Sequence, residues 1–287
     1  MREYEILSTE DVTEEIKIFD LYAPMVSRRC QPGQFLIVMN DERGERIPLT
    51  IADFDREKGT VEIVFQVVGK STAQLGAMKP GDALYAVVGP FGHPSEIRGH
   101  RKVVTVGGGI GIAPVYPIAR GYRENGAYTI NIIGARHGDL LVYEEKMRAI
   151  SDELIVCTDD GSRGRKALVT EPLKEILEAH DDVDLCLAIG PPIMMKFVAE
   201  TTRPLGVKTI VSLNSVMIDG TGMCGGCRVD VGGKTFFTCV DGPEFDGHAV
   251  DFDLLMSRQS MYRDQERQAM ERWEHECRLG LQPGGEN

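Results

Sequence analysis

Apolar and polar residues alternate over short runs in the first third of the chain, and turn residues separate these runs. The sequences Gln31-Pro32-Gly33 and Lys79-Pro80-Gly81 are two such turns. Alternation over a few residues, bounded by Gly and Pro, predicts β-strands with one buried face. The predicted strands are residues 3–8, 16–22, 34–39, 60–68 and 83–88. Several short strands at this spacing predict a small antiparallel β barrel within residues 1–98.

After residue 98 the pattern changes to apolar runs that alternate with segments of helical periodicity. The predicted strands are residues 102–106, 128–134, 154–158, 184–190 and 208–213. The predicted helices are about residues 113–125, 141–149, 170–179 and 192–202. Strands that alternate with helices predict a parallel sheet covered by helices on both faces. We expect this α/β domain to span residues 99–213.

The remaining sequence predicts a small module and a helical tail. Residues 214–250 are rich in Gly and Cys, and residues 251–287 are polar, with a helix expected from 251 to about 277. Residues at helical spacing in the tail predict a stripe that docks on another surface. We expect this surface to be the body of the chain, and a partner protein is the alternative. The stripe consists of Tyr262, Glu266, Ala269, Met270, Trp273 and Cys277.

Composition argues against a nucleic-acid-binding, membrane or secreted protein. The formal net charge of −12 argues against a broad surface for nucleic acid or anionic membrane. The N-terminus lacks the pattern of a signal peptide, and glycines and prolines interrupt the most apolar stretch, residues 103–119, so no membrane span is expected. Three of the seven cysteines crowd into residues 224–239, unlike a secreted disulfide framework. We expect a cytoplasmic protein.

Three cysteines and an aspartate form the most informative pattern. Asp219, Cys224, Cys227 and Cys239 follow the spacing D-x4-C-x2-C-x11-C. A plant-type [2Fe–2S] cluster is held by C-x4-C-x2-C and a distant fourth cysteine, so Asp219 stands at the first ligand position. A carboxylate can ligate iron, and the loop's glycines let the backbone wrap closely around a cluster. The spacing therefore predicts a [2Fe–2S] cluster.

A zinc site, or three thiols without a metal, are the alternatives at this loop. Structural zinc prefers tetrahedral sets of Cys and His, often as paired C-x2-C elements. The loop contains one such pair, and the next histidine along the chain is His248. Either alternative predicts a purified protein without iron.

A glycine-rich turn follows the first strand of the α/β domain. Residues 103–114 read VVTVGGGIGIAP, and the N–H groups at such a helix start bind pyrophosphate. The turn departs from G-x-G-x-x-G, and no acidic residue closes the next strand, so a standard Rossmann fingerprint is not supported. Ordinary strand–helix turns are the alternative. The predicted dinucleotide-binding residues here are Gly107, Gly108, Gly109, Ile110, Gly111 and Pro114.

Further residues at the same sheet edge extend this prediction. Gly190 and Pro191 follow another strand and add a second loop where α/β sheets bind ligands. Arg136 follows the second strand, where an arginine contacts the 2′-phosphate of NADP(H).

Two barrel segments have residues suited to a flavin pyrophosphate. Arginine, hydroxyl side chains and exposed amides bind phosphate oxygens. An ordinary surface arginine and a Ser-Thr turn are the alternatives. The residues are Arg46, Pro48, Leu49 and Thr50 in one segment, and Gly69, Ser71 and Thr72 in the other.

Taken together, these segments resemble the ferredoxin–NADP reductase superfamily over roughly residues 1–250. Residues 46–50 match the family's R-x-P-[FL]-[ST] segment and residues 69–72 its G-x-[ST]-[ST]-type turn, both of which hold FAD. Residues 89–92 match the linker near the flavin. The resemblance also implies that Asp160, in the segment after Cys157, lies near the nicotinamide.

Within this superfamily the chain is most similar to electron-transfer subunits that carry a [2Fe–2S] loop. Those of dihydroorotate dehydrogenase usually have four Cys ligands and end soon after the last one. Asp219 and the tail after Val250 instead resemble the small subunits of electron-bifurcating NADH-dependent ferredoxin:NADP reductases. That resemblance implies FAD, a [2Fe–2S] cluster and NAD(H), with a larger flavin and iron–sulfur subunit as heterodimer partner and ferredoxin reached through the complex.

Electron transfer of this kind requires no acid–base residue, so no catalytic residue is nominated. Cys30, Cys157, Cys186 and Cys277 are expected to be packing or surface cysteines. The alternatives are the electron-transfer subunit of a dihydroorotate dehydrogenase, a reductase subunit of a hydrogenase or sulfite reductase, and a non-catalytic, metal-stabilised redox-sensing module.

Overall fold

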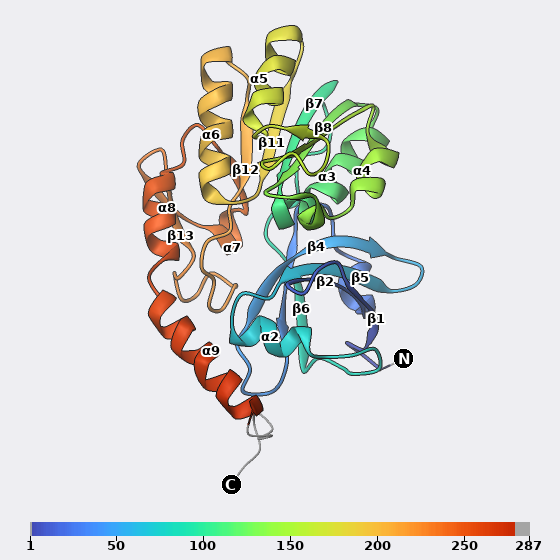
Figure 1. The fold of residues 1–287 in the computed structure, drawn as a ribbon, viewed down its shortest axis with the longest axis vertical. Helices are drawn as coiled ribbons and strands as arrows, with labels where there is room; N and C mark the ends of the chain where they lie inside the picture. The colour runs from blue at the N-terminus through green and yellow to red at the C-terminus, as the bar shows by residue number, and fades with distance from the viewer. Residues whose placement is uncertain (1, 279–287) are drawn as a thin grey trace.

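The computed structural model describes residues 2–278, which form a barrel, an α/β domain and a smaller module beside the contact between them (Figure 1). The barrel is a six-stranded antiparallel sheet in the order β1-β2-β5-β4-β3-β6. The backbone N–H of Leu84 donates to the carbonyl of Tyr4 at 3.0 Å, which ties the start of the first strand to the segment before the last. The strands are β1 Ile6–Asp11, β2 Ile16–Tyr22, β3 Phe35–Met39, β4 Ile47–Asp55, β5 Thr60–Gln66 and β6 Ala86–Phe91, with short helices α1 Pro24–Ser27 and α2 Lys70–Gly76.

The predicted barrel is confirmed, but the sequence reasoning missed β4. Pro48 interrupts the alternation there, because proline cannot donate to a sheet ladder and is rare in central strands. The structure accommodates it because β4 changes partners along its length. Its first half pairs with β3, including Pro48 opposite Ile37, and its second half pairs with β5. Pro48 therefore has a strand neighbour on one side.

The α/β domain contains a seven-stranded sheet in the order β10-β9-β8-β7-β11-β12-β15. All neighbours pair in parallel except β15, which is antiparallel to β12. The consecutive residues Val103 and Val104 of β7 belong to different core clusters, one containing α3 and α4 and the other α5 and α6. The prediction of a parallel sheet covered on both faces is confirmed. The elements are β7 Lys102–Gly108, β8 Tyr128–Ala135, β9 Glu153–Thr158, β10 Arg165–Lys166, β11 Leu185–Ile189, β12 Thr209–Ser212, β15 Glu244–Asp246, α3 Ile112–Glu124, α4 Glu144–Ile150, α5 Thr170–Ala179 and α6 Pro192–Thr202, with short 3-10 helices η1 Gly109–Gly111, η2 Gly138–Leu140 and η3 Arg203–Leu205.

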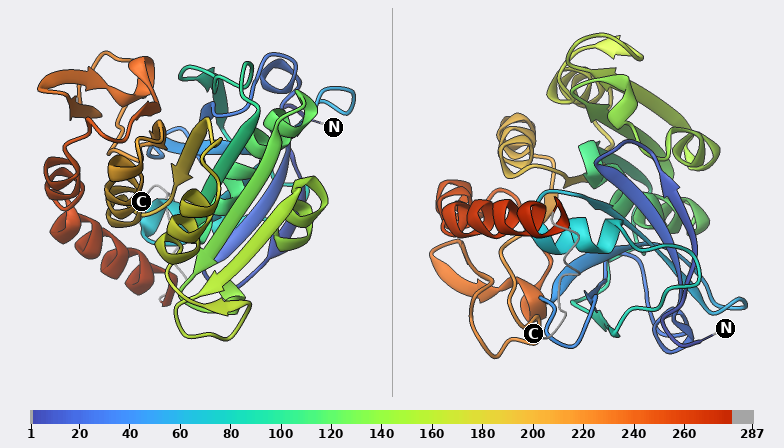
Figure 2. Two further views of the ribbon diagram at one scale, coloured as in Figure 1. Left: turned by 90° about the horizontal axis from the view of Figure 1, so that it is seen from above. Right: turned by 60° about the horizontal axis from the view of Figure 1, so that its bottom comes forward.

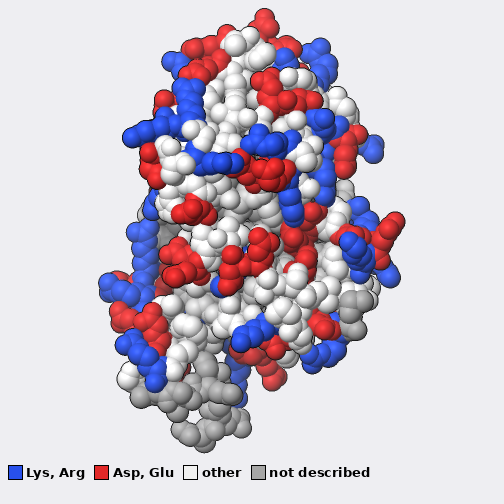
Figure 3. Space-filling model, turned by 45° about the vertical axis from the view of Figure 1, so that its right-hand side comes forward, with Lys and Arg blue, Asp and Glu red and all other residues white. Residues whose placement is uncertain are grey.

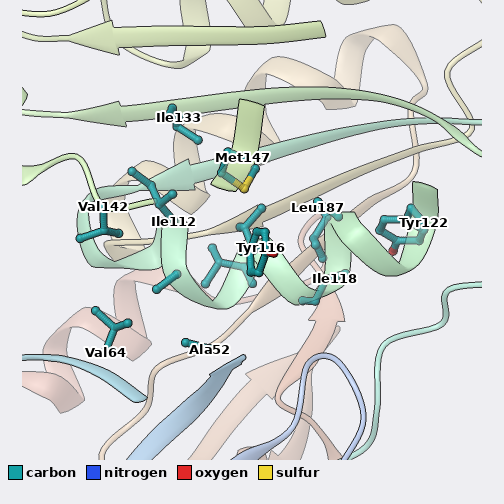
Figure 4. Packing of buried hydrophobic residues seen from close by; sticks show 14 of the residues in the cluster. Ala52, Val64, Ile112, Tyr116, Ile118, Tyr122, Ile133, Val142, Met147 and Leu187 are labelled. Atoms are coloured by element: carbon teal, nitrogen blue, oxygen red, sulfur yellow. The ribbon is translucent and has the colours of Figure 1, made fainter. Parts of the chain in front are cut away.

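Helix α3 lies between the barrel and the parallel sheet (Figure 4). Ala52 and Val64 of the barrel belong to the same buried cluster as Ile112 and Tyr116 of this helix. The helix is apolar on both sides, as expected for a helix enclosed by two layers. It joins the cores of the two domains.

Charged side chains surround this contact. Arg120 of α3 pairs with Asp53 of β4 at 2.8 Å, and Lys146 of α4 pairs with Glu62 of β5 at 2.6 Å. Glu62 also accepts a hydrogen bond from the hydroxyl of Tyr143. These contacts hold the α/β domain in one orientation on the barrel.

The C-terminal module contains the hairpin β13 Arg228–Val231 and β14 Lys234–Phe237, and the short helix α7 Thr238–Asp241. Its last strand, β15, joins the sheet of the α/β domain. Two helices follow, α8 Phe252–Gln259 and α9 Arg263–Arg278. Phe252 and Leu255 of α8 are buried in the core cluster that contains α6. Helix α9 lies alongside α2 of the barrel (Figures 1 and 2).

The tail is helical, in two helices, and only part of the predicted stripe docks on the body. The chain turns between α8 and α9, and the part of the stripe that meets the body is short. Ala269, Met270 and Trp273 are half-buried, but Tyr262, Glu266 and Cys277 are exposed. The reason is that α9 runs past the barrel and contacts one short helix there.

Acidic and basic side chains are interspersed on the face shown in Figure 3. That face has no extended basic area. Within residues 2–278, no helix has the length and apolar character needed to cross a membrane.

Candidate functional site

The four predicted cluster ligands lie together, and they do so as two pairs. The Sγ atoms of Cys227 and Cys239 are 3.2 Å apart, and Sγ of Cys224 is 3.4 Å from Oδ1 of Asp219. All four come from the loop before β13 or from α7, and the cysteines are free thiols. Asp219 also accepts hydrogen bonds from the backbone N–H groups of Thr221 and Cys224, at 3.1 and 3.0 Å.

This paired arrangement fits a two-iron cluster better than a zinc ion. Each iron of a [2Fe–2S] cluster takes two of the four protein ligands, whereas structural zinc takes four around one centre. The donor set therefore fits the cluster predicted from the spacing.

The protonation of these groups depends on their surroundings. The hydrogen bond from the Thr221 N–H holds the pKa of Asp219 below its ordinary value, so this carboxyl is ionised at neutral pH. Burial raises the pKa of Cys239 to about 12, so this thiol is protonated without a metal. Because a metal binds the thiolate, loading this site releases protons.

The site has a buried end and an exposed end. Cys227 and Cys239 are only 2% and 1% exposed and pack against Phe35 and Ile37 of β3. Cys224 lies at the surface beside Met223, which is 89% exposed. The buried end faces the barrel and the exposed end faces solvent.

The cluster loop sits directly on the barrel. Gly220 has φ +72°, and a Cβ at this position would lie 2.1 Å from Cδ1 of Ile37. Ile37 is opposite Pro48 of β4 and Val88 of β6. Because directly opposed residues point to the same face of a sheet, Pro48 and the cluster loop share one face of the barrel. No pattern in the sequence indicated this contact.

The two candidate flavin segments also come together. Arg46 is exposed, and Pro48, Leu49 and Thr50 are half-buried along β4. Gly69 precedes α2, and Thr72 accepts hydrogen bonds from the N–H groups of Val68 and Gly69 at 3.0 and 3.1 Å.

Hydrogen bonds of Ser71 connect the segments. Its hydroxyl donates to Glu45, the neighbour of Arg46, and its carbonyl accepts from Asn40 at 2.9 Å. Val68, next to Gly69, is 75% exposed, and Val88, opposite Ile37, is 50% exposed, so each offers apolar surface that a flat ring can cover. Val88 was not among the residues nominated from the sequence.

The glycine loops of the α/β domain meet where the strand order reverses. Chain order runs from β7 to β8 and β9 on one side and then continues with β11 on the other, so β7 and β11 flank the switch point where such sheets bind ligands. A Cβ on Gly108 would lie 2.2 Å from Sδ of Met194, and one on Gly111 would lie 2.3 Å from the carbonyl oxygen of Ile189. Close packing therefore also requires these glycines. The residues at this edge are Gly107, Gly108, Gly109, Ile110, Gly111, Pro114, Gly190 and Pro191.

Arg136 and Asp160 lie together at another part of this edge. The N–H of Asp160 donates to the carbonyl of Arg136 at 3.2 Å, and the N–H of Gly138 donates to the hydroxyl of Ser162 at 2.8 Å. The resemblance predicts Asp160 near the nicotinamide. In the structure the segment of Asp160 follows β9, which is two strands away from β7. The Gly190 loop follows β11, on the other side of β7. Asp160 and the Gly190 loop therefore lie on opposite sides of β7.

The loops after β8 and β9 enclose a hollow of about 460 Å³. Arg163 in this hollow is bound to Glu144 through two hydrogen bonds of 3.0 and 2.9 Å, which hold the pKa of Glu144 below its ordinary value. Sequence reasoning missed these residues, because only their position after strand ends could have indicated them. The lining residues are His137, Gly138, Asp139, Leu141, Glu144, Asp160, Ser162 and Arg163.

The other cysteines lie apart from these sites. Cys30, Cys157 and Cys186 are buried, and Cys277 is exposed, as expected for packing and surface cysteines. Burial raises the pKa of Cys186 to about 12.

Comparison with known proteins matches each part of this arrangement. Residues 105–200 match the oxidoreductase NAD-binding domain, and residues 214–251 match the iron–sulfur cluster binding domain of dihydroorotate dehydrogenase B. A Thermotoga maritima protein described as a dihydroorotate dehydrogenase B (NAD(+)) electron transfer subunit homolog is 46% identical, over 94% of this chain and 95% of its own.

Solved structures extend these matches. A chain from the structure of an NADH-dependent reduced ferredoxin–NADP oxidoreductase, studied for flavin-based electron bifurcation, is 44% identical with a TM-score of 0.90. The match covers 95% of this chain and 98% of that one. A ferredoxin NADP+ reductase from Neisseria gonorrhoeae with bound FAD and NADP shares the fold at 20% identity and a TM-score of 0.59, over 70% of this chain and 90% of its own.

Proposed function

The chain belongs to the family of dihydroorotate dehydrogenase B electron-transfer subunits and their homologues, and we propose that it moves electrons between NAD(H), FAD and a [2Fe–2S] cluster in a two-subunit oxidoreductase. One observation carries this proposal. The buried end of the cluster site packs on the barrel face that holds Pro48, and its other end is exposed. Such a site can receive electrons from a flavin on the barrel and release them to a partner at the surface.

At the cluster, Asp219, Cys224, Cys227 and Cys239 are the proposed ligands. Two ligands lie on the barrel side and two on the solvent side, and Phe35 and Ile37 keep water from the inner pair. This division gives electrons a path between the barrel and the surface of the chain.

The proposed FAD-binding residues would hold the flavin on the barrel. Arg46 is suited to its pyrophosphate, and Gly69 leaves open space in front of the backbone. The hydroxyls of Ser71 and Thr72 would bind it by turning away from Glu45 and from the carbonyl of Gly69, to which they donate in this structure. Pro48, Leu49 and Thr50 provide a strand against which the ring system can lie. When bound, FAD accepts two electrons as hydride and releases them one at a time.

The proposed dinucleotide site lies across the carboxyl edge of the parallel sheet. Gly107 to Gly111 and Pro114 would bind its pyrophosphate, and Gly190 and Pro191 would lie on the side of the reacting ring. The adenosine half extends toward Arg136 and Asp160, because the ribose in such folds lies beyond the second strand. Asp160 would then lie near the adenosine half of the dinucleotide, and not near the nicotinamide as the resemblance implies.

We propose that the preferred dinucleotide is NAD(H). Asp139 and Asp160 contribute carboxylates to the hollow after β8, whereas Glu144 is paired with both Arg163 and Arg148. Arg136, beside Asp160, is the side chain that would favour a 2′-phosphate. A 2′-phosphate would bring further negative charge to this surface. Titration of the holoprotein with NADH and NADPH should give a lower Kd for NADH, and tighter binding of NADPH would contradict this choice.

The partner we propose is a larger flavin and iron–sulfur subunit of a ferredoxin:NADP oxidoreductase. Two features support it over a dihydroorotate dehydrogenase, namely an aspartate at the first ligand position and the two helices after the cluster module. The match to the NADH-dependent reduced ferredoxin–NADP oxidoreductase covers 95% of this chain, so it includes most of this tail. Co-purification with a dihydroorotate dehydrogenase would contradict the assignment.

Variants of Asp219 test the cluster. We expect iron, sulfide and flavin in the purified protein, and an electron paramagnetic resonance signal after reduction with NADH. Asp219→Ala should lose most of its iron, whereas Asp219→Cys restores a monoanionic ligand and should retain it. Thr235→Ala, at an exposed position of β14 outside the ligand loop, is the control. Zinc in place of iron, or full iron content in Asp219→Ala, would refute the ligand set.

A further inference from the structure

The tail helix α8 reaches the cluster loop through one side chain. Nη2 of Arg258 donates a hydrogen bond of 3.1 Å to the carbonyl oxygen of Gly226. Gly226 stands between Cys224 and Cys227, and its own N–H donates to Sγ of Cys224 at 3.3 Å. Arg258 therefore contacts the turn between two of the proposed ligands.

Several contacts fix Arg258 in this position. Leu255, one helical turn earlier on the same face, is buried beneath α8. Gln259 donates to the carbonyl of Asn214 at 2.7 Å, at the start of the module. Asp251 caps the helix by accepting from the N–H of Leu254 at 2.9 Å. The guanidinium is thus held by the packed face of the helix.

The charge of Arg258 is not neutralised by its neighbours. Within residues 2–278, the guanidinium makes no ion pair with a carboxylate, and the contact we find for it is to the loop carbonyl. Together with Arg228, which donates to the carbonyl of Gly225 at 3.1 Å, it lines a hollow of about 190 Å³ that also reaches Cys224. The loop therefore has two positive groups close to its exposed end.

We propose that Arg258 is a positioning residue that holds the Gly226 turn and raises the reduction potential of the [2Fe–2S] cluster. The proposal rests on the function proposed above, because it requires a cluster in this loop. It assigns the first tail helix a role in setting how readily the cluster accepts an electron.

Electrostatics determines the direction of the effect. Three thiolates and one carboxylate are all monoanionic, so the oxidised site is net negative and the added electron makes it more so. A fixed cation nearby stabilises the reduced form more than the oxidised form. Loss of the cation should therefore lower the potential. Partial exposure to solvent limits the size of this effect.

The test measures the cluster potential in the purified holoprotein. The ratio of reduced to oxidised cluster is followed by electron paramagnetic resonance at the wild-type midpoint. In Arg258→Gln this ratio should fall about threefold to tenfold, which corresponds to ~30–60 mV for a one-electron couple. Arg258→Lys keeps the charge and should shift the potential by less than half as much. Arg267→Gln is the matched control, because it removes one positive charge from the same tail without touching the loop.

The outcomes separate this inference from the proposed function. If the wild-type protein contains no iron, the proposed function fails. If the wild-type protein is loaded and loaded Arg258→Gln has an unchanged potential, only the role of Arg258 is refuted. Should Arg258→Gln lose the cluster, the lysine variant decides, and a potential near that of the wild type supports the proposal. Loss of the cluster from Arg258→Lys as well, or an equal shift in Arg267→Gln, overturns it.

Discussion

The contact between Gly220 and Ile37 joins the cluster loop to the barrel, and replacing Gly220 by Ala tests it. The new Cβ would lie 2.1 Å from Cδ1 of Ile37, at a backbone φ of +72°. The left-handed conformation should cost about 1–2 kcal/mol for alanine. Overpacking against Ile37 should cost a further ~1–3 kcal/mol. We therefore expect Gly220→Ala to lower the free energy of unfolding by about 2–5 kcal/mol and to reduce the iron content.

Gly233 provides the matched control for the backbone contribution. Its φ is +75°, and nothing lies within 4 Å of a Cβ at this position. Gly233→Ala should therefore cost only the conformational part, about 1–2 kcal/mol. The difference between the two variants measures the contact with Ile37.

A second substitution should relieve the clash. Ile37→Val removes the Cδ1 methyl and should by itself cost about 0.5–1.5 kcal/mol. In the double variant with Gly220→Ala the next atom, Cγ1, is 3.3 Å from the new Cβ, so the two changes should be less harmful together than their sum by ~1–3 kcal/mol. Urea titrations followed by circular dichroism, with iron analysis of each variant, measure these terms. Additive effects, or equal losses in Gly220→Ala and Gly233→Ala, would show that the loop does not sit on β3.

Three further predictions concern other parts of the chain. Desolvation raises the pKa of Glu244 despite the hydrogen bond from Ser95, so the ionised carboxylate destabilises the folded protein above the ordinary carboxyl pKa. Glu244→Gln should therefore raise the melting temperature most at pH 8 and progressively less toward pH 5. A difference in melting temperature that stays constant over this range would refute the reasoning. In metal-free protein iodoacetamide should modify Cys224 and Cys277 first, and loading the cluster should protect only Cys224, as mass spectrometry can measure. Helix α9 has no fully buried residue, so it should unfold before the rest of the chain. The fluorescence of Trp273, the only tryptophan, should therefore change at lower urea concentration than the circular dichroism signal. Coincident midpoints of the two signals would contradict this.

Local patterns were sufficient to predict the architecture and to nominate the cluster ligands. Alternation with a period of two predicted most barrel strands, and the alternation of strands and helices predicted the parallel sheet, because each pattern reports which face an element buries. Asp219, Cys224 and Cys227 lie within nine residues, so their spacing alone predicts that they belong to one metal-binding loop. Strand β4 was not predicted, because Pro48 interrupts its alternation of apolar and polar residues. Residues 46–50 were nonetheless recognised as a motif that resembles an FAD-binding segment.

Tertiary structure decided which of these surfaces meet. Ile37 and Gly220 are far apart in the chain, as are Gly226 and Arg258, and no periodicity in either segment encodes its partner. The same holds for β15, which leaves the cluster module to extend the sheet of the α/β domain. Hydrophobic patterning specifies a buried face but not the surface that buries it, since many apolar surfaces can satisfy the same pattern. The sequence by itself therefore determined that this chain has a cluster loop, and only the fold determined that one end of the loop rests on the barrel and the other is held by the tail.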